Sequence, residues 1–157
     1  MTLIALLNEL WAAVAALGFA MLFNVPVRAL PACCTLAVIG HASRFALIHW
    51  GIDLVSATLL AALLVGFLAQ GWARQSGRIS VIYAISAAIP MVPGVSMYHA
   101  VQALLHLATA QSVNTTASEA WLVDAGINAT RAAMVVLSLT LGIAAPRLLW
   151  PRVHKKD

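Results

Sequence analysis

Long apolar runs separated by short polar gaps dominate this chain. The runs cover about residues 3–23, 29–50, 54–72, 79–110 and 119–149. An α-helix rises 1.5 Å per residue and a hydrocarbon core is about 30 Å thick, so about 20 apolar residues suffice to cross it. The pattern therefore predicts an all-α fold, a polytopic transmembrane helix bundle of about five spans that forms one domain over residues 1–157.

The fourth run is longer than a single straight span requires, since a helix of this length would extend about 48 Å. Its centre reads Ile89-Pro-Met-Val-Pro-Gly94, in which both prolines lack an N–H donor and the glycine adds backbone freedom. We therefore expect two helical pieces joined by an unwound stretch at Pro90–Gly94. Irregular backbone at membrane depth is tolerated only where protein buries it or where it lines a water-filled cavity. If both pieces crossed the membrane, the chain would have six spans.

Composition and charge agree with a membrane protein. The chain is 62% hydrophobic and 9% charged, whereas soluble domains carry about 25% charged residues. The net charge of +4 does not indicate nucleic-acid binding, because seven of the nine Lys and Arg residues lie in polar gaps or near the C-terminus. With five spans all seven fall on one side of the bilayer, which predicts an external N-terminus and a cytoplasmic C-terminus. These residues are Arg28, Arg74, Arg78, Arg147, Arg152, Lys155 and Lys156.

The two remaining arginines lie inside predicted spans. Arg44 is about 14 residues into the second span and Arg131 about 12 residues into the fifth, so each lies roughly 20 Å along its helix. A charge at that depth costs on the order of 3 kcal/mol. Each arginine must therefore face a partner, a cavity or a ligand. One interpretation is a buried ion pair with Glu9 or Asp124, and the other is contact with an anionic substrate; a pair that opens when substrate arrives would reconcile them.

Each arginine has polar neighbours on its own helix face. His41 and Arg44 are spaced i, i+3, and Asp124, Asn128 and Arg131 follow at i, i+4 and i+7. Lipid would penalise such a polar stripe, so we expect it to face the interior of the bundle. His41 is a candidate proton carrier, because an unperturbed histidine titrates near pH 6.5. A hydrogen bond from His41 to a neighbouring helix is the alternative.

The broken fourth run supplies the other candidate substrate contacts, which are Pro90, Pro93, Gly94, Ser96 and Tyr98. Unwound backbone leaves amide groups free to bind a carboxylate, and a helix that begins after the break would add a favourable dipole. Neither a hydrolase motif nor a spaced set of metal ligands is present in the sequence. We therefore expect a protein that is not an enzyme and that has no cofactor and no metal.

Three motifs in this order resemble the threonine/serine exporter (ThrE) family. They are Phe23-Asn-Val-Pro-Val-Arg-Ala-Leu30, Ile39-Gly-His-Ala-Ser-Arg44 and Ala88-Ile-Pro-Met-Val-Pro-Gly-Val95, the last followed by Tyr98. Along nearly its whole length the chain is similar to the small YjjB-type subunit of split exporters. In single-chain members the equivalent region is the C-terminal membrane half.

The resemblance implies a hetero-oligomer with a YjjP-type membrane subunit in the bacterial cell inner membrane, which would make the external N-terminus periplasmic. An odd number of spans without a visible internal repeat also suggests a second chain. For split members the resemblance implies export of succinate or a similar dicarboxylate, and for single-chain members export of threonine and serine. A non-transporting scaffold subunit, whose arginines only hold the partner, is the alternative of another class.

The two substrate classes make different demands on a site. A dicarboxylate requires two separated cations, which Arg44 and Arg131 would supply. An amino acid requires one cation for its carboxylate and an acceptor for its ammonium group, which Asp124 or Glu9 would offer. These demands favour the small anionic dicarboxylate.

Overall fold

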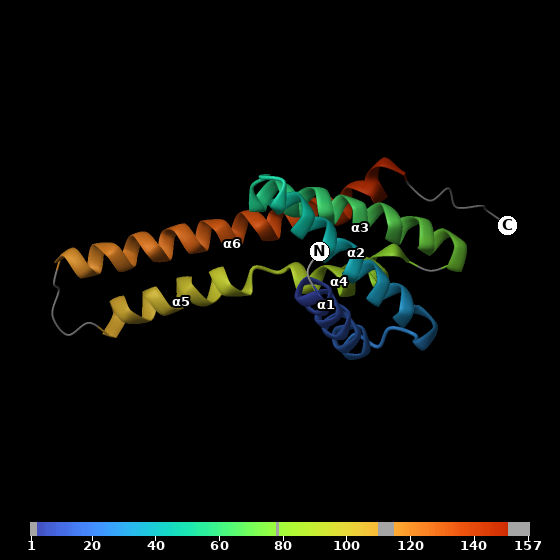
Figure 1. Cartoon of the computed structure of the whole chain (residues 1–157), viewed down its shortest axis with the longest axis horizontal. Coiled ribbons are helices and arrows are strands. Elements are labelled where there is room, and N and C mark those ends of the chain that lie inside the picture. Colours follow the sequence, from blue (N-terminus) through green and yellow to red (C-terminus); the bar gives the residue numbers. More distant parts are fainter. Residues whose placement is uncertain (1–2, 78, 110–114, 151–157) are drawn as a thin grey trace. The chain divides into compact units, whose positions relative to one another are not determined.

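The computed structural model describes residues 3–77, 79–109 and 115–150. All regular structure within these residues is helical (Figure 1). By contacts the chain divides into two compact units, the first formed by Met1–Val92 with Ser138–Asp157 and the second by Pro93–Leu137. The elements are α1 (Leu3–Leu22), η1 (Val27–Ala29), α2 (Leu30–His49), α3 (Leu54–Ser76), α4 (Ser80–Ala88), η2 (Ile89–Met91), α5 (Gly94–Thr109) and α6 (Thr115–Leu149).

The predicted all-α membrane fold is confirmed, and each apolar run forms helix. Three helical stretches, Val27–His49, Leu54–Ser76 and Ala117–Leu149, are long and apolar enough to cross a bilayer. The broken pair of α4 and α5 makes a fourth if it is taken as one span. The chain is thus a multi-pass membrane protein. A fifth span would be α1, of which Leu10–Leu22 is recognised as a shorter apolar helix, so the count of five stays a prediction.

The turn between α2 and α3 is short and well specified. Gly51 adopts a φ of 87°, in the left-handed region that favours glycine. Asp53 caps α3, because its carboxylate accepts hydrogen bonds from the backbone N–H groups of Ser56 at 3.0 Å and Val55 at 3.1 Å. Hydrogen bonds from Ser56 in the first place, and from Val55 in addition, lower the pKa of the Asp53 carboxyl. At its other end α3 stops at Gly77, which has a φ of 68°.

The break in the fourth apolar run is shorter than the predicted stretch Pro90–Gly94. Pro90 lies in the first turn of η2, where a missing N–H costs no hydrogen bond, and Gly94 already begins α5. Within the predicted stretch, only Val92 and Pro93 lie outside helices. Val92 has φ −61° and ψ 136°, the extended conformation that a following proline favours. Pro93 therefore sets the place of the break.

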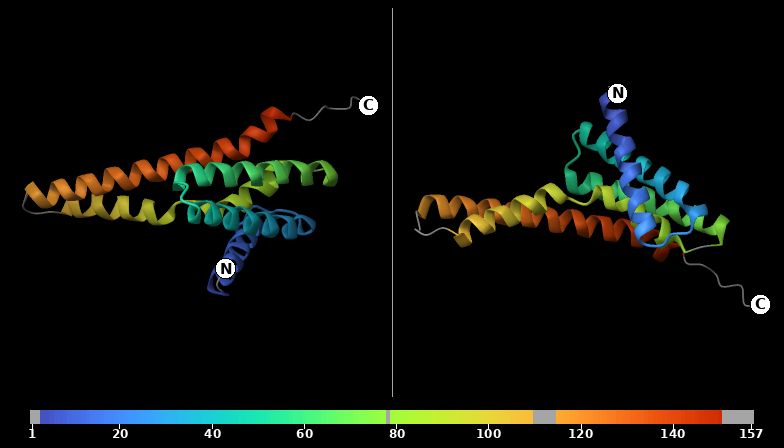
Figure 2. Two further views of the ribbon diagram at one scale, coloured as in Figure 1. Left: turned by 45° about the horizontal axis from the view of Figure 1, so that its top comes forward. Right: turned by 90° about the horizontal axis from the view of Figure 1, so that it is seen from below.

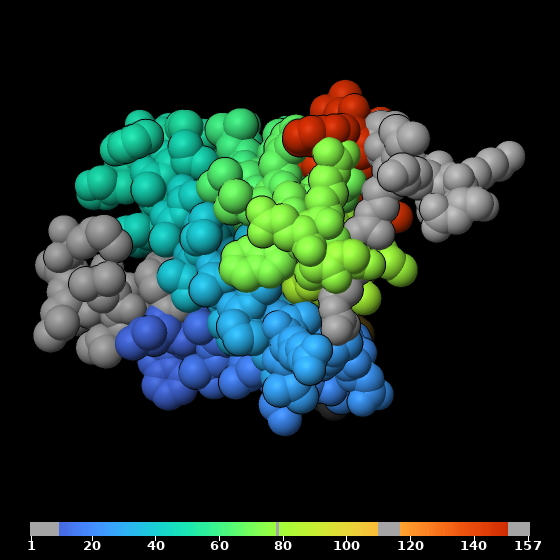
Figure 3. Space-filling model, turned by 90° about the vertical axis from the view of Figure 1, so that its right-hand side faces the viewer, coloured from blue at the N-terminus to red at the C-terminus, as the bar shows by residue number. Residues whose placement is uncertain are grey.

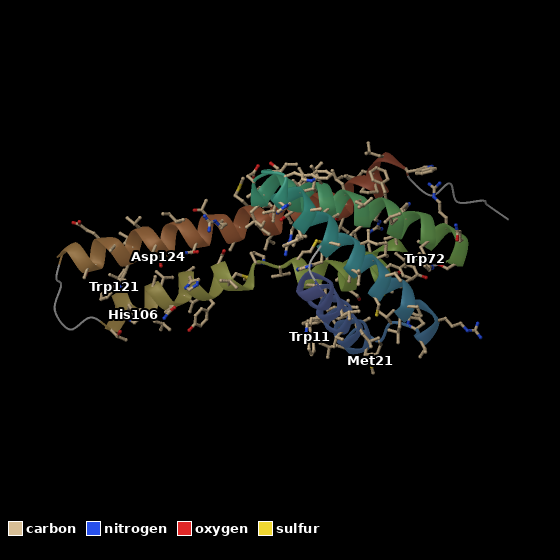
Figure 4. All side chains as sticks on the ribbon, in the orientation of Figure 1. Trp11, Met21, Trp72, His106, Trp121 and Asp124 are labelled. Carbon is tan, nitrogen blue, oxygen red and sulfur yellow. The ribbon has the colours of Figure 1, made fainter. Side chains whose placement is uncertain are left out.

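In the first unit, α2 packs against α1, α3 and α4, and α1 crosses over α2 and α4 (Figure 2). Trp11 and Met21 on α1 are mostly exposed and point away from these helices (Figure 4). The side of α3 that is turned to the core is made mostly of small residues, which include Ala57, Ala61 and Ala69. Small side chains let helix backbones approach closely, as is common between membrane helices.

A close helix contact joins α3 to the part of α6 that belongs to the first unit. A Cβ atom added to Gly66 would lie 2.8 Å from the Gly142 carbonyl oxygen and 2.9 Å from Pro146 Cγ. Because Pro146 has no N–H, the Gly142 carbonyl lacks its usual partner one turn later in α6. Glycine at both positions thus permits a contact between backbones that any side chain would separate.

The end of α6 is held by polar groups of α3. Gln70 Nε2 and Arg74 Nη2 donate to the Trp150 carbonyl at 3.1 and 3.2 Å, and the Arg74 guanidinium lies 3.8 Å from the centre of the Trp150 ring. Figure 3 views this end of the unit, where the end of α6 (red) adjoins the junction of α3 and α4 (light green). Cation–π contact and carbonyl capping therefore both stabilise the end of α6.

Candidate substrate site

Arg44 meets the break in the fourth apolar run directly. Its Nη1 donates a hydrogen bond of 2.6 Å to the carbonyl oxygen of Met91, the last residue of η2. Because the helix ends there, that carbonyl has no N–H one turn later to bind. The carbonyl end of a helix also carries partial negative charge, which a cation stabilises. Hydrogen bonds to charged groups contribute about 1.5–3 kcal/mol, comparable to the cost of an arginine at the depth that the sequence predicts.

Gly40, one turn before Arg44, lies against the side chain of Met91. A Cβ atom on Gly40 would lie 2.6 Å from Val65 Cγ2 and 3.2 Å from Met91 Cε, and Met91 is fully buried. One face of α2 therefore holds Met91 at two points, its thioether at Gly40 and its carbonyl at Arg44. This fixes Arg44 in register with the break.

Two further candidates lie in the first unit beside this contact. His41 is half-buried on α2, one turn before Arg44, and Pro90 is half-buried in η2, next to Met91. Pro90 is thus the neighbour in sequence of the residue that Arg44 binds, and a substrate site formed by Arg44 and Pro90 stays a prediction. Gly40 and Met91 were not among the candidates, because a small apolar contact carries no chemical signal. Their position gave the available hint: Gly40 precedes Arg44 by one helical turn, and Met91 lies between the two prolines of the break.

The polar stripe of the fifth apolar run lies on α6 in the second unit. Asn128 Nδ2 donates to the Asp124 side chain at 2.9 Å and to the Asp124 carbonyl at 3.0 Å, so these residues share a face. Arg131 follows one turn later and is exposed. The expectation that the stripe faces the bundle interior stays a prediction.

Helix α5 contributes an aromatic contact to the same unit. The His106 ring stacks on Trp121 of α6, with ring centres 5.5 Å apart and planes inclined by 22° (Figure 4). Trp121 precedes Asp124 by three residues, so this contact holds α5 against α6 beside the stripe. His106 was not a candidate, because a lone histidine on an apolar helix gives no indication of its partner.

The remaining candidates lie at the beginning of α5. Pro93 precedes the helix and accepts a hydrogen bond of 3.0 Å from the backbone N–H of Met97. Gly94, Ser96 and Tyr98 lie in the first two turns, with Ser96 half-buried and Tyr98 exposed. The first N–H groups of a helix have no carbonyl one turn earlier. These groups are therefore of the kind that binds a carboxylate.

Arg44 belongs to the first unit, and Arg131 belongs to the second. A site that combines the two arginines stays a prediction. Of the two acids proposed as ion-pair partners, Asp124 accepts a hydrogen bond from Asn128, and the Glu9 side chain lies outside the described residues.

A separate cavity of about 250 Å³ lies between α4 and the connection that joins α1 to η1. Its lining is predominantly apolar, and no candidate substrate residue belongs to it. The lining residues are Phe23, Asn24, Val25, Pro26, Val81, Ile82, Ile85 and Ser86. The first of the three motifs therefore shapes this cavity, whereas the second and third meet at Arg44 and Met91.

Apolar helices of membrane-spanning length, a broken helix and an arginine bound to the broken end define a multi-pass membrane protein with the features of a transporter. The chain belongs to the threonine/serine exporter (ThrE) family, whose model matches residues 8–149. It is thus a transporter of the exporter type and not an enzyme. No solved structure matches the chain.

Proposed function

We propose that this chain is one subunit of a secondary exporter for small organic acids, with succinate or a similar dicarboxylate as substrate. The observation that carries the proposal is Arg44, a cation well inside a membrane helix that binds the broken end of another helix. Arginine is suited to this role because its planar fork binds a carboxylate through two parallel hydrogen bonds. Arg131 supplies the second cation that a dicarboxylate requires.

Export of threonine or serine is the second candidate, and the family to which the chain belongs favours it. An amino acid needs one cation and one acceptor, and Asp124 provides an acceptor already oriented by Asn128. Asp124→Asn removes the acceptor charge and keeps the size of the side chain. It should abolish threonine export but leave succinate export largely intact, so the variant separates the two substrates.

The functional unit in this proposal contains a second, YjjP-type membrane subunit and resides in the bacterial inner membrane. Seven Lys and Arg residues in gaps and tail against none in the opposite gaps support a cytoplasmic C-terminus and a periplasmic N-terminus. The absence of a visible internal repeat supports the second chain, since many secondary transporters place their site between two related halves.

Efflux from cells that lack both subunits tests the proposal. The cells would receive this chain alone, the partner alone, or both, and release of succinate and threonine would be followed over time. We expect succinate efflux only with both chains. Full efflux from this chain alone would contradict the need for a partner, and undiminished efflux from the partner alone would identify this chain as a scaffold.

A further inference from the structure

A well-defined turn ends α1. Asn24 adopts a φ of 53°, the left-handed conformation that asparagine tolerates better than most residues. Its N–H group donates to the Met21 carbonyl at 3.0 Å, and the Val25 N–H group donates to the Ala20 carbonyl at 2.9 Å. These two hydrogen bonds close the helix in the Schellman geometry, in which the residue after the left-handed one turns back onto the helix. The turn therefore holds Val25 in its buried position.

The cavity of about 250 Å³ lies between this turn and α4. Val25 and Ser86, which line it, are buried, so they form its floor. Phe23, Asn24 and Ile85 also line it but are exposed, so they form its rim. The cavity is thus closed at one end and open at the other.

The lining suits an apolar occupant better than water. A buried water molecule needs about two to four polar partners. The polar residues of the lining are Asn24 at the rim and Ser86 at the floor, and the Ser86 hydroxyl already donates to the Ile82 carbonyl at 3.4 Å. An apolar chain would fill the space without leaving a polar group unpaired. In a bilayer, the acyl chains of lipids are apolar chains that can enter such an opening.

Both walls of the cavity adjoin the same surface of the predicted bilayer. Pro26 lies in the gap after the first apolar run, and Ser80 begins α4 directly after the gap at residues 74–78. The two candidate spans that contain α2 and α3 separate these gaps, which brings the chain back to the side from which it started. Ser86 lies about 9 Å along α4 from Ser80. We therefore expect the cavity to extend from the membrane surface into the hydrocarbon core.

A positive charge lies beside the rim of the cavity. Arg28 follows the lining residue Pro26 by two positions, so their Cα atoms are at most about 8 Å apart, and its side chain is exposed. A guanidinium binds a phosphate group through paired hydrogen bonds, and the Asn24 amide at the rim offers a further donor. Basic residues beside a membrane helix attract anionic lipids. An apolar cavity with a cation at its opening therefore fits an acyl chain that ends in an anionic headgroup.

We propose that the cavity between α4 and the turn at Asn24 binds an anionic glycerophospholipid, which places one acyl chain in the cavity and its phosphate at Arg28. The site shares no residue with the candidate substrate site, so the inference is independent of the proposed function. It assigns a role to the first of the three sequence motifs, residues 23–30. In that motif Asn24 forms the turn, Pro26 contributes a wall and Arg28 binds the headgroup.

Photolabelling of the purified full chain in mild detergent tests the site. The probe is phosphatidylglycerol with a diazirine in one acyl chain, and unlabelled phosphatidylglycerol or the zwitterionic phosphatidylcholine competes with it. Mass spectrometry locates the labelled residues. Ile85→Trp covers the opening with a large ring, and Ile79→Trp is its control, because Ile79 lies outside the lining and the native side chains are similarly exposed, at 44% and 55%.

We expect the label on α4 or on residues 23–26, and phosphatidylglycerol should displace it at a several-fold lower concentration than phosphatidylcholine. Ile85→Trp should lower the labelling several-fold, whereas Ile79→Trp should leave it unchanged. Arg28→Gln should abolish the preference for phosphatidylglycerol. Arg28→Lys should keep the preference, since lysine also binds phosphate. Arg147→Gln, which removes an exposed arginine from the last turn of α6, should keep it too.

Three results would overturn the proposal. The first is equal labelling of the two tryptophan variants, and the second is equal displacement of the label by both lipids. The third is an absence of label from the lining, which would leave the cavity to a side chain of a second subunit. The competition between the two lipids uses the unsubstituted chain, so it decides the question even if a variant fails to accumulate.

Discussion

The contact between α3 and α6 predicts which glycines the fold can exchange for alanine. A methyl group added at Gly142 would lie 2.5 Å from the Cβ of Ala62 and 2.9 Å from the backbone atoms Ala62 C and Leu63 N. Backbone atoms cannot turn aside as a flexible side chain can, so the two helices would have to move apart. Overpacking of this kind costs typically 1–3 kcal/mol, and we expect Gly142→Ala to lower the free energy of unfolding by about that amount.

The same helices contain matched controls. A Cβ atom at Gly126 in α6, or at Gly71 in α3, would meet nothing within 4 Å. Alanine is a better helix former than glycine by about 1 kcal/mol, so Gly126→Ala and Gly71→Ala should leave stability unchanged or raise it slightly. Gly66→Ala should be destabilising, because its methyl group would meet the Gly142 carbonyl at 2.8 Å.

Unfolding of the purified protein in mild detergent by increasing sodium dodecyl sulfate, followed by circular dichroism, measures these differences. Within each helix the two alanine variants should differ by about 1–3 kcal/mol, the cost of overpacking, because the gain in helix propensity is common to both. Equal stabilities for Gly142→Ala and Gly126→Ala would show that α3 and α6 do not pack as described.

Three further predictions concern topology and the ends of helices. A cysteine between Gln111 and Ser118 should react with an impermeant thiol reagent added outside the cell and one beside Lys155 should not; the reverse labelling would contradict the predicted orientation. The pKa of Asp53 is lowered in the folded chain, so its cap stabilises α3 fully above the ordinary pKa of 3.8 and less as the pH falls through the lowered value. Asp53→Asn keeps an oxygen acceptor but has no carboxyl group to titrate. Its free energy of unfolding should therefore fall less than that of the unsubstituted chain between about pH 5 and about pH 2. An identical acid profile for both proteins would contradict the cap. Trp150→Leu should weaken the end of α6 by about 0.5–1 kcal/mol, because it removes the ring over Arg74 but keeps the carbonyl; no further loss on adding Trp150→Leu to Arg74→Gln is expected, and full additivity would refute the contact.

The sequence predicted the elements well because hydropathy and turn chemistry are local signals. Gly51 and Asp53 delimit α2 and α3 by backbone freedom and capping, and the structure places the helix ends there. The predicted start of the last span at residue 119 was late, since α6 begins at Thr115, where polar residues before the apolar run are still helical. The break was predicted as too long, because Pro90 is compatible with the first turn of a 3₁₀ helix.

The candidate site was predicted in its charges but not in its packing. Arg44 is conspicuous because a charge within an apolar run demands a partner, yet that partner is a backbone carbonyl, which every residue has. Gly40 and Gly142 are likewise indistinguishable in sequence from Gly71 or Gly126, and only the neighbouring helix determines which of them are constrained. The pattern of apolar and polar residues predicts helices, but it does not predict which residues of different helices are in contact.

Succinate efflux from arginine variants, measured beside their abundance in the membrane, tests the central claim most directly. Arg44→Gln and Arg131→Gln should reach normal abundance but lose export. The lysine variants keep the charge without the fork and should export poorly, whereas Arg28→Gln in η1 should export normally. Normal efflux from both glutamine variants at normal abundance would contradict an arginine site for the exported anion.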